Sequence, residues 1–168
     1  IGSRDFSVEL IGSGEFCNFA NYMRRLGCRY LQIMGDGDFA VERIGLVPVY
    51  YPLDEKPHSF ANTLHQRIYD TCVRTLRLCM FEHYEDCPWR EQALYGMDSR
   101  NQMLAGYYAF GETDMPRESL RLLADSQKES GLLELTAPSE FQKTIPTFSL
   151  AWINSVSEYV LFSGDKDF

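Results

Sequence analysis

The sequence predicts a mostly α-helical fold with a short β N-terminal part. Before Pro57, apolar and polar residues alternate with a period of two, which is typical of strands. After Pro57, apolar residues recur every three or four positions, which is typical of helices. With 45% hydrophobic and 14% aromatic residues, the 168-residue chain can bury a substantial core. We therefore predict two parts: residues 1–57, the end of a β-module with a linker, and residues 58–168, a helical region.

The β part is expected to hold about three strands. Residues 6–10 and 31–33 alternate in polarity, and residues 39–53 are rich in valine, isoleucine and tyrosine. The glycine-rich run GDGD at 35–38 provides a turn between the last two. Three strands are too few to form a closed sandwich alone.

The first two helices are predicted from their caps and their apolar spacing. Ser59 is the natural N-cap of the first helix, whose apolar positions are Phe60, Ala61, Leu64, Ile68, Cys72, Leu76, Cys79 and Met80. The second should begin near Asp98 or Ser99 and end at Gly111, since glycine commonly ends helices.

Two further helices follow. One should begin at Asp114, carry Pro116 in its first turn and end before Gly131. The last should run over about 146–162 and end at Gly164. The predicted order is a β part followed by four helices paired as hairpins.

The apolar surface of these helices exceeds what they can cover themselves. The second and fourth helices are apolar on more than one face, as in helices buried from several sides. The chain also stops at SGDKDF, where another helix is expected to begin. We expect a fragment of a longer fold, with possible self-association through the uncovered faces.

Charge and composition exclude several classes of partner. A net charge of −8 argues against binding nucleic acid or an anionic membrane. No apolar run approaches the ~20 residues that span a bilayer, and no signal-peptide pattern opens the chain. The five cysteines show no zinc-site spacing, and His83 and Cys87 would share a metal only on a helix. We expect no metal site.

The segment EDCPWREQALYGMDSR, residues 85–100, allows two readings. In the structural reading, Asp86 caps a helix with Pro88 in its first turn, Asp98 caps another, and Trp89 anchors the core. In the functional reading, Asp86, Glu91 and Asp98 converge, because positions seven apart share a helix face. Carboxylates among aromatic rings suit sugar chemistry, and like charges raise the pKa of a candidate acid.

The run Asp86-Cys87-Pro88-Trp89-Arg90-Glu91, followed by Asp98, resembles the signature of the bacterial α-L-rhamnosidases, glycoside hydrolase family 78. The segments GCRYLQI (27–33) and IPTFSLAWINSVSEYVLFSGD (145–165) are also similar to that family. The resemblance implies an (α/α)6 barrel preceded by β-sandwich domains. Residues 1–57 would then end a β-sandwich, and 58–168 would form the first hairpins of an incomplete barrel.

The resemblance also implies roles for individual residues. Glu91 matches the general acid, Asp86 and Asp98 match carboxylates that hold rhamnose hydroxyls, and Arg90 matches the arginine beside them. Tyr95 stands where the family usually has a tryptophan, and would contact substrate as an aromatic platform. Leu94 and Met97 replace family glycines, which leaves the sugar open. Three further rings are candidates for either the pocket or the core: Trp89, Tyr107 and Trp152.

The implied reaction is hydrolysis of terminal α-L-rhamnosyl residues with inversion and without an organic cofactor. Inversion needs an acid and a base roughly 6.5–9.5 Å apart, and we expect the base outside this chain. The glutamates that match no base motif are Glu118, Glu129, Glu134 and Glu158. Two alternatives stay open: a non-catalytic carbohydrate-binding or interaction protein on the same scaffold, and a related hydrolase for another sugar.

Overall fold

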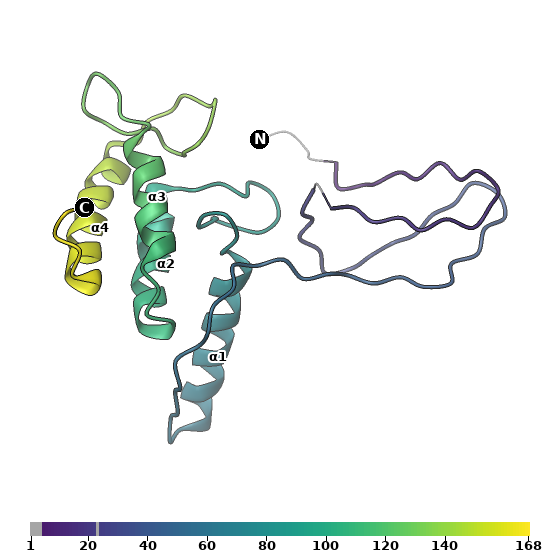
Figure 1. The fold of residues 1–168 in the computed structure, drawn as a ribbon, viewed down its shortest axis with the longest axis horizontal. Coiled ribbons are helices and arrows are strands. Elements are labelled where there is room, and N and C mark those ends of the chain that lie inside the picture. The colour runs from purple at the N-terminus through teal and green to yellow at the C-terminus, as the bar shows by residue number, and fades with distance from the viewer. Residues whose placement is uncertain (1–4, 23) are drawn as a thin grey trace. The chain divides into compact units, whose positions relative to one another are not determined.

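The computed structural model describes residues 5–22 and 24–168, in two compact units that divide between Val49 and Tyr50. The second unit holds four helices (Figure 1): α1 (Thr63–Leu78), α2 (Gly96–Ala109), α3 (Asp114–Ala124) and α4 (Pro146–Ser163). The prediction of a mostly helical fold is confirmed. None of the helices in the described part of the chain is long and apolar enough to cross a membrane.

The strands predicted in the β part are not formed. Residues 5–22 and 24–49 contain extended segments and bends but no strand. Large apolar side chains stay exposed there, with Ile11 at 87%, Tyr30 at 85% and Val47 at 82%. A strand needs a neighbour that pairs with its N–H and C=O groups and a surface that covers its apolar face. The alternation indicates which residues share a face. It does not provide a neighbouring strand to pair with or a surface that covers the apolar face.

Helix α1 begins later than predicted because Asn62, not Ser59, is its N-cap. The Asn62 Oδ1 atom accepts hydrogen bonds from the amides of Leu64 (2.8 Å) and His65 (3.2 Å). These amides have no partner within the helix, so the side chain satisfies them. Ser59 lies in the exposed segment before the helix.

The segment before α1 is fastened to the helical unit by backbone hydrogen bonds. The amide of Tyr51 donates to the carbonyl of Met80 (2.9 Å), and the amide of Lys56 donates to that of Ala109 (2.8 Å). The Lys56 Nζ atom also approaches the carbonyl of Tyr107 (3.4 Å). The two Lys56 donors reach carbonyls in the last turn of α2, which the helix leaves without partners.

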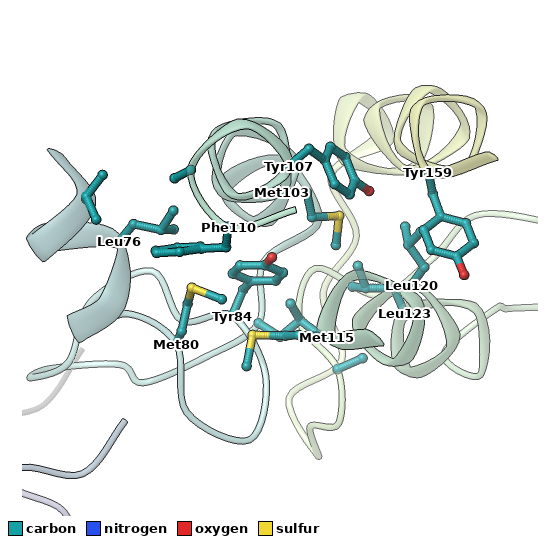
Figure 2. Packing of buried hydrophobic residues seen from close by; sticks show 14 of the residues in the cluster. Leu76, Met80, Tyr84, Met103, Tyr107, Phe110, Met115, Leu120, Leu123 and Tyr159 are labelled. Atoms are coloured by element: carbon teal, nitrogen blue, oxygen red, sulfur yellow. The ribbon is translucent and has the colours of Figure 1, made fainter. Parts of the chain in front are cut away.

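Helix α2 is central to the helical unit because it contacts each of the other three helices. Side chains from all four helices and from the α1–α2 connection form one core (Figure 2), which includes Leu76, Met80, Tyr84, Met103, Tyr107, Phe110, Met115, Leu120, Leu123 and Tyr159. Burying one large apolar side chain contributes about 1.5–3 kcal/mol. This shared core fixes the helices, and with them the connections that carry the candidate site.

The ends of α2 and α4 follow from their stop residues. Helix α2 starts at Gly96, two residues before the predicted start, and its predicted stop Gly111 has φ +72°. Helix α4 has Pro146 in its first turn and Gly164 as C-cap with φ 74°, as predicted. Glycine adopts this left-handed conformation without the steric cost that other residues incur.

Two side-chain interactions tie α4 to its neighbours. The Trp152 Nε1–H group donates to the carbonyl of Leu120 on α3 (3.0 Å). Arg100 on α2 pairs with Glu158 on α4, with 3.1 Å between Nε and Oε2. The opposite side of α4 remains apolar and open, with Leu150 and Leu161 exposed at 60% and 78%. This matches the expectation that α4 is apolar on more than one face.

Replacing Asn62 by alanine is expected to weaken the first turn of α1 by about 1 kcal/mol. The amides of Leu64 and His65 would lose their acceptor and exchange with solvent about five-fold faster. Hydrogen-exchange NMR measures this rate. The matched control is Ser59→Ala, which should leave both rates unchanged; a faster rate in the control would restore Ser59 as the cap.

Candidate active site

The segment that carries the predicted site is a closed loop rather than a helix. The Asp86 amide donates to the carbonyl of Ala93 (3.0 Å), and the Asp86 Oδ1 atom accepts from the Ala93 amide (3.1 Å). Residues 88–91 between them form a turn. The prediction that Asp86 caps a helix with Pro88 in its first turn is therefore wrong, because Asp86 bonds across the loop. The Asp86 carboxylate still accepts a hydrogen bond from a backbone amide, but that amide belongs to Ala93 across the loop and not to the first turn of a helix.

The far side of the loop is held by Gln92. This residue has φ 51°, in the left-handed region that non-glycine residues rarely adopt. Its Nε2 atom donates to the carbonyl of Pro88 (3.0 Å), across the turn. The loop that presents Glu91 is thus constrained at its neck and within its turn.

Tyr95 follows the loop and is fixed on two sides. Its backbone forms an isolated antiparallel bridge with Thr136, and the neighbouring Ala137 amide donates to the carbonyl of Leu94 (3.3 Å). The edge of its ring meets the ring of Phe148 on α4, with 6.4 Å between centroids. These contacts from the α3–α4 connection and from α4 hold Tyr95 at the head of α2.

The hydroxyl of Tyr95 points to Glu91. It donates a hydrogen bond to Glu91 Oε2 at 2.9 Å. Burial raises the pKa of Tyr95 to about 12, and the hydrogen bond and charge of Glu91 and the charges of Asp86 and Asp98 add to the rise. The phenol therefore keeps its proton at neutral pH and remains a donor. All three carboxylates are thus near enough to the Tyr95 hydroxyl for their charges to act on it.

Asp98 lies in the first turn of α2. Loss of surrounding water raises the pKa of its carboxyl, a hydrogen bond from its own amide lowers it, and the charges of Asp86 and Glu91 raise it further. The net direction is upward. The structure thus brings the three predicted carboxylates together, through a loop and a helix start instead of one helix face.

The other predicted residues lie outside this group or in the core. Arg90 is exposed on the loop, and Trp89 is 54% exposed, so the interpretation of Trp89 as a core anchor is wrong. Its place in the exposed turn explains this, because the turn directs it away from the core. Tyr107 is buried in the core, and Trp152 is partly buried against it.

Several residues that hold the candidate site in place were not predicted from the sequence. Gln102 on α2 donates from Nε2 to the carbonyl of Glu85 (2.7 Å), and so ties the start of the loop to the helix. Gln102 lies four residues after Asp98, so both share one helix face, and this spacing could have predicted that Gln102 lies near the site. Thr136, Ala137 and Phe148 are distant in sequence, and no local pattern links them to the loop.

Three of the glutamates that match no base motif are engaged in ion pairs. Glu158 pairs with Arg100, Glu134 with Lys128 (2.9 Å) and Glu118 with Arg121 (3.3 Å). In each pair the cationic side chain occupies at least one oxygen of the carboxylate.

The possible metal pair is not formed. His83 and Cys87 do not lie on a helix, and His83 Nδ1 is 2.7 Å from the carbonyl oxygen of Tyr84. Across residues 5–22 and 24–168, no group of three or more His, Cys, Asp or Glu side chains is placed to hold a metal ion.

Comparison with known proteins identifies the family. The model of the bacterial α-L-rhamnosidase six-hairpin glycosidase domain matches residues 59–168, more than half of the chain. The chain belongs to this family. The residues that match the rhamnosidase domain include all four helices and the closed loop. No curated protein matches the chain.

Two solved rhamnosidases share this fold. The glycoside hydrolase family 78 rhamnosidase of Bacillus sp. GL1 is 34% identical with a TM-score of 0.63, over 66% of this chain and 12% of that enzyme. The rhamnosidase from Klebsiella oxytoca, solved with rhamnose bound, is 24% identical with a TM-score of 0.60, over 66% of this chain and 23% of that enzyme. The chain thus spans less than a quarter of either structure.

Replacing Asp86 by alanine is expected to lower the free energy of unfolding of the 168-residue chain by about 1 kcal/mol. The Ala93 amide would lose its side-chain acceptor, and such hydrogen bonds typically contribute this much. Asp86→Asn keeps an Oδ1 acceptor and should change stability by less than half as much. Urea titration followed by circular dichroism measures both. Equal losses in the two variants would show that charge, and not loop closure, is what Asp86 contributes.

Proposed function

We propose that this chain is a segment of an inverting α-L-rhamnosidase and that Glu91 is its general acid. Membership of the rhamnosidase family makes glycoside hydrolysis the expected reaction. The observation that supports the assignment is the hydrogen bond of the Tyr95 hydroxyl to Glu91, with Asp86 and Asp98 near enough for their charges to act on the same hydroxyl. Neighbouring carboxyl groups that flank the scissile bond are what glycoside hydrolysis uses.

In the proposed reaction, Glu91 gives its proton to the glycosidic oxygen as the bond to the sugar breaks. Water attacks the opposite face of the sugar and passes a proton to a carboxylate base. We propose that this base lies outside residues 1–168, a proposal that agrees with the shared part being 12% and 23% of the two matched rhamnosidases. The segment alone is therefore expected to be inactive or nearly so.

Asp86 and Asp98 are proposed to hold sugar hydroxyls. A carboxylate has two oxygens, so Asp86 can close the loop through Oδ1 and accept a hydroxyl through Oδ2. Asp98 is exposed at the start of α2, where a sugar can reach it. Arg90 is exposed on the same loop and can donate to the substrate from beside the carboxylates.

The sugar is proposed to be rhamnose, which is bound in the solved Klebsiella oxytoca enzyme. Of the departures from the family pattern, Leu94 is buried in the core at 1% exposure, so it does not face a substrate. Met97 is 40% exposed and Tyr95 lies at the carboxylates, so only these two bear on the choice of sugar.

Glu91→Gln in the whole protein that contains this segment is expected to lower kcat/KM by ~10²–10⁴ on a rhamnoside with a poor leaving group. The loss should be much smaller on p-nitrophenyl α-L-rhamnoside, because p-nitrophenolate leaves without protonation. Release of rhamnose from both substrates measures this, and other p-nitrophenyl pyranosides test the sugar.

The matched control is Glu82→Gln, an exposed glutamate of the connection before the loop, which should leave both rates unchanged. Equal losses of kcat/KM on the two substrates would show that Glu91 is not the general acid. Hydrolysis of another pyranoside alone would keep the acid and exclude rhamnose. Sugar binding without turnover in the unmodified protein would favour the non-catalytic binding protein.

A further inference from the structure

Glu91 lies on the turn of residues 88–91, outside the helices of the described chain. A catalytic acid must be held close to its productive position, because small displacements cost large factors in rate. Tyr95 is the neighbour with the required rigidity. Its backbone bridges to Thr136, its ring meets Phe148, and its hydroxyl donates to Glu91 Oε2 at 2.9 Å.

We propose that Tyr95 is a positioning residue whose hydroxyl holds the carboxyl group of Glu91, in addition to any stacking of its ring on the sugar. This inference rests on the proposed role of Glu91 as the acid. The hydrogen bond joins Glu91 Oε2 to a side chain that the Thr136 bridge and the Phe148 ring already hold.

The charges around Tyr95 favour such a donor. Asp86 approaches from the neck of the loop and Asp98 from the first turn of α2, while α4 contributes only the uncharged ring of Phe148. Among three carboxylates, a neutral hydroxyl that remains protonated offsets part of their mutual repulsion. A hydrogen bond to an ionised acceptor is also stronger than one between neutral groups.

Holding the acid in place has a kinetic consequence that a ring contact with the sugar does not. A displaced acid slows only the step that needs its proton. Removing the hydroxyl should therefore slow hydrolysis of a rhamnoside with a poor leaving group and change that of p-nitrophenyl α-L-rhamnoside much less.

The test compares Tyr95→Phe with Tyr95→Leu in the whole protein, on the rhamnoside with the poor leaving group. We expect Tyr95→Phe to lower kcat about ten-fold with little change in KM. We also expect Tyr95→Phe to change kcat on p-nitrophenyl α-L-rhamnoside by much less, because that leaving group needs no proton. Tyr95→Leu removes the ring as well and should in addition raise KM. A partly misfolded variant would lose kcat on both substrates alike.

The matched control is Tyr159→Phe, because the Tyr159 hydroxyl also donates to a carboxylate, Asp165 Oδ2 at 3.2 Å. This control should leave kcat on both substrates unchanged. A Tyr95→Phe variant with the kcat of the unmodified protein, or with equal losses on the two substrates, would overturn the inference while leaving Glu91 as the acid. Activity that survives Glu91→Gln on the rhamnoside with the poor leaving group would overturn both.

Discussion

The pair of hydrogen bonds between Asp86 and Ala93 determines where the candidate acid lies. Glu91 is on neither a helix nor a strand, so its position depends on how the ends of its loop are joined. The backbone bond and the side-chain bond between these two residues join them directly. Gln102 ties the start of the same loop to α2 through Glu85. The loop that presents Glu91 is thereby closed on itself and tied to α2.

Helix α2 contributes both to the core and to the candidate site, through different parts of its length. Its middle and C-terminal part contribute Met103, Tyr107 and Phe110 to the core. Its N-terminal turn carries Asp98 among other carboxylates, an arrangement that repulsion and desolvation disfavour. The positive end of the helix dipole offsets part of this cost. The core contacts of the helix therefore hold in place a cluster that would otherwise separate.

Local signals were enough to predict the helices but not the strands. Pro146 and Gly164 mark the ends of α4, because each acts through its own backbone geometry. Ser59 and Asn62 are both residue types that cap helices well. The structure uses Asn62, whose side chain accepts from the amides of Leu64 and His65. The alternating residues before Pro57 describe two faces, but a strand also requires a partner that the alternation does not identify.

The residues of the site were predicted from the motif, whereas their geometry was not. The Asp86–Ala93 bonds close the loop, while Tyr95 is held by its bridge to Thr136, a contact between segments far apart in the chain. The hydrogen bond from the Tyr95 hydroxyl to Glu91 depends on this position of Tyr95. Long-range backbone contacts of this kind leave no periodic trace in a sequence. A motif can therefore identify the carboxylates and still suggest the wrong local structure for them.

The most direct test of the carboxylate cluster is the pKa of Asp98, measured by NMR of its carboxyl carbon in the 168-residue chain. We expect a value above the ordinary 3.8, since desolvation and the charges of Asp86 and Glu91 together outweigh the bond from its own amide. In Asp86→Asn the value should fall but remain raised, because one charge is removed while the desolvation stays. An Asp98 carboxyl that titrates at or below its ordinary pKa, or that ignores the Asp86 substitution, would show that the carboxylates do not form one site.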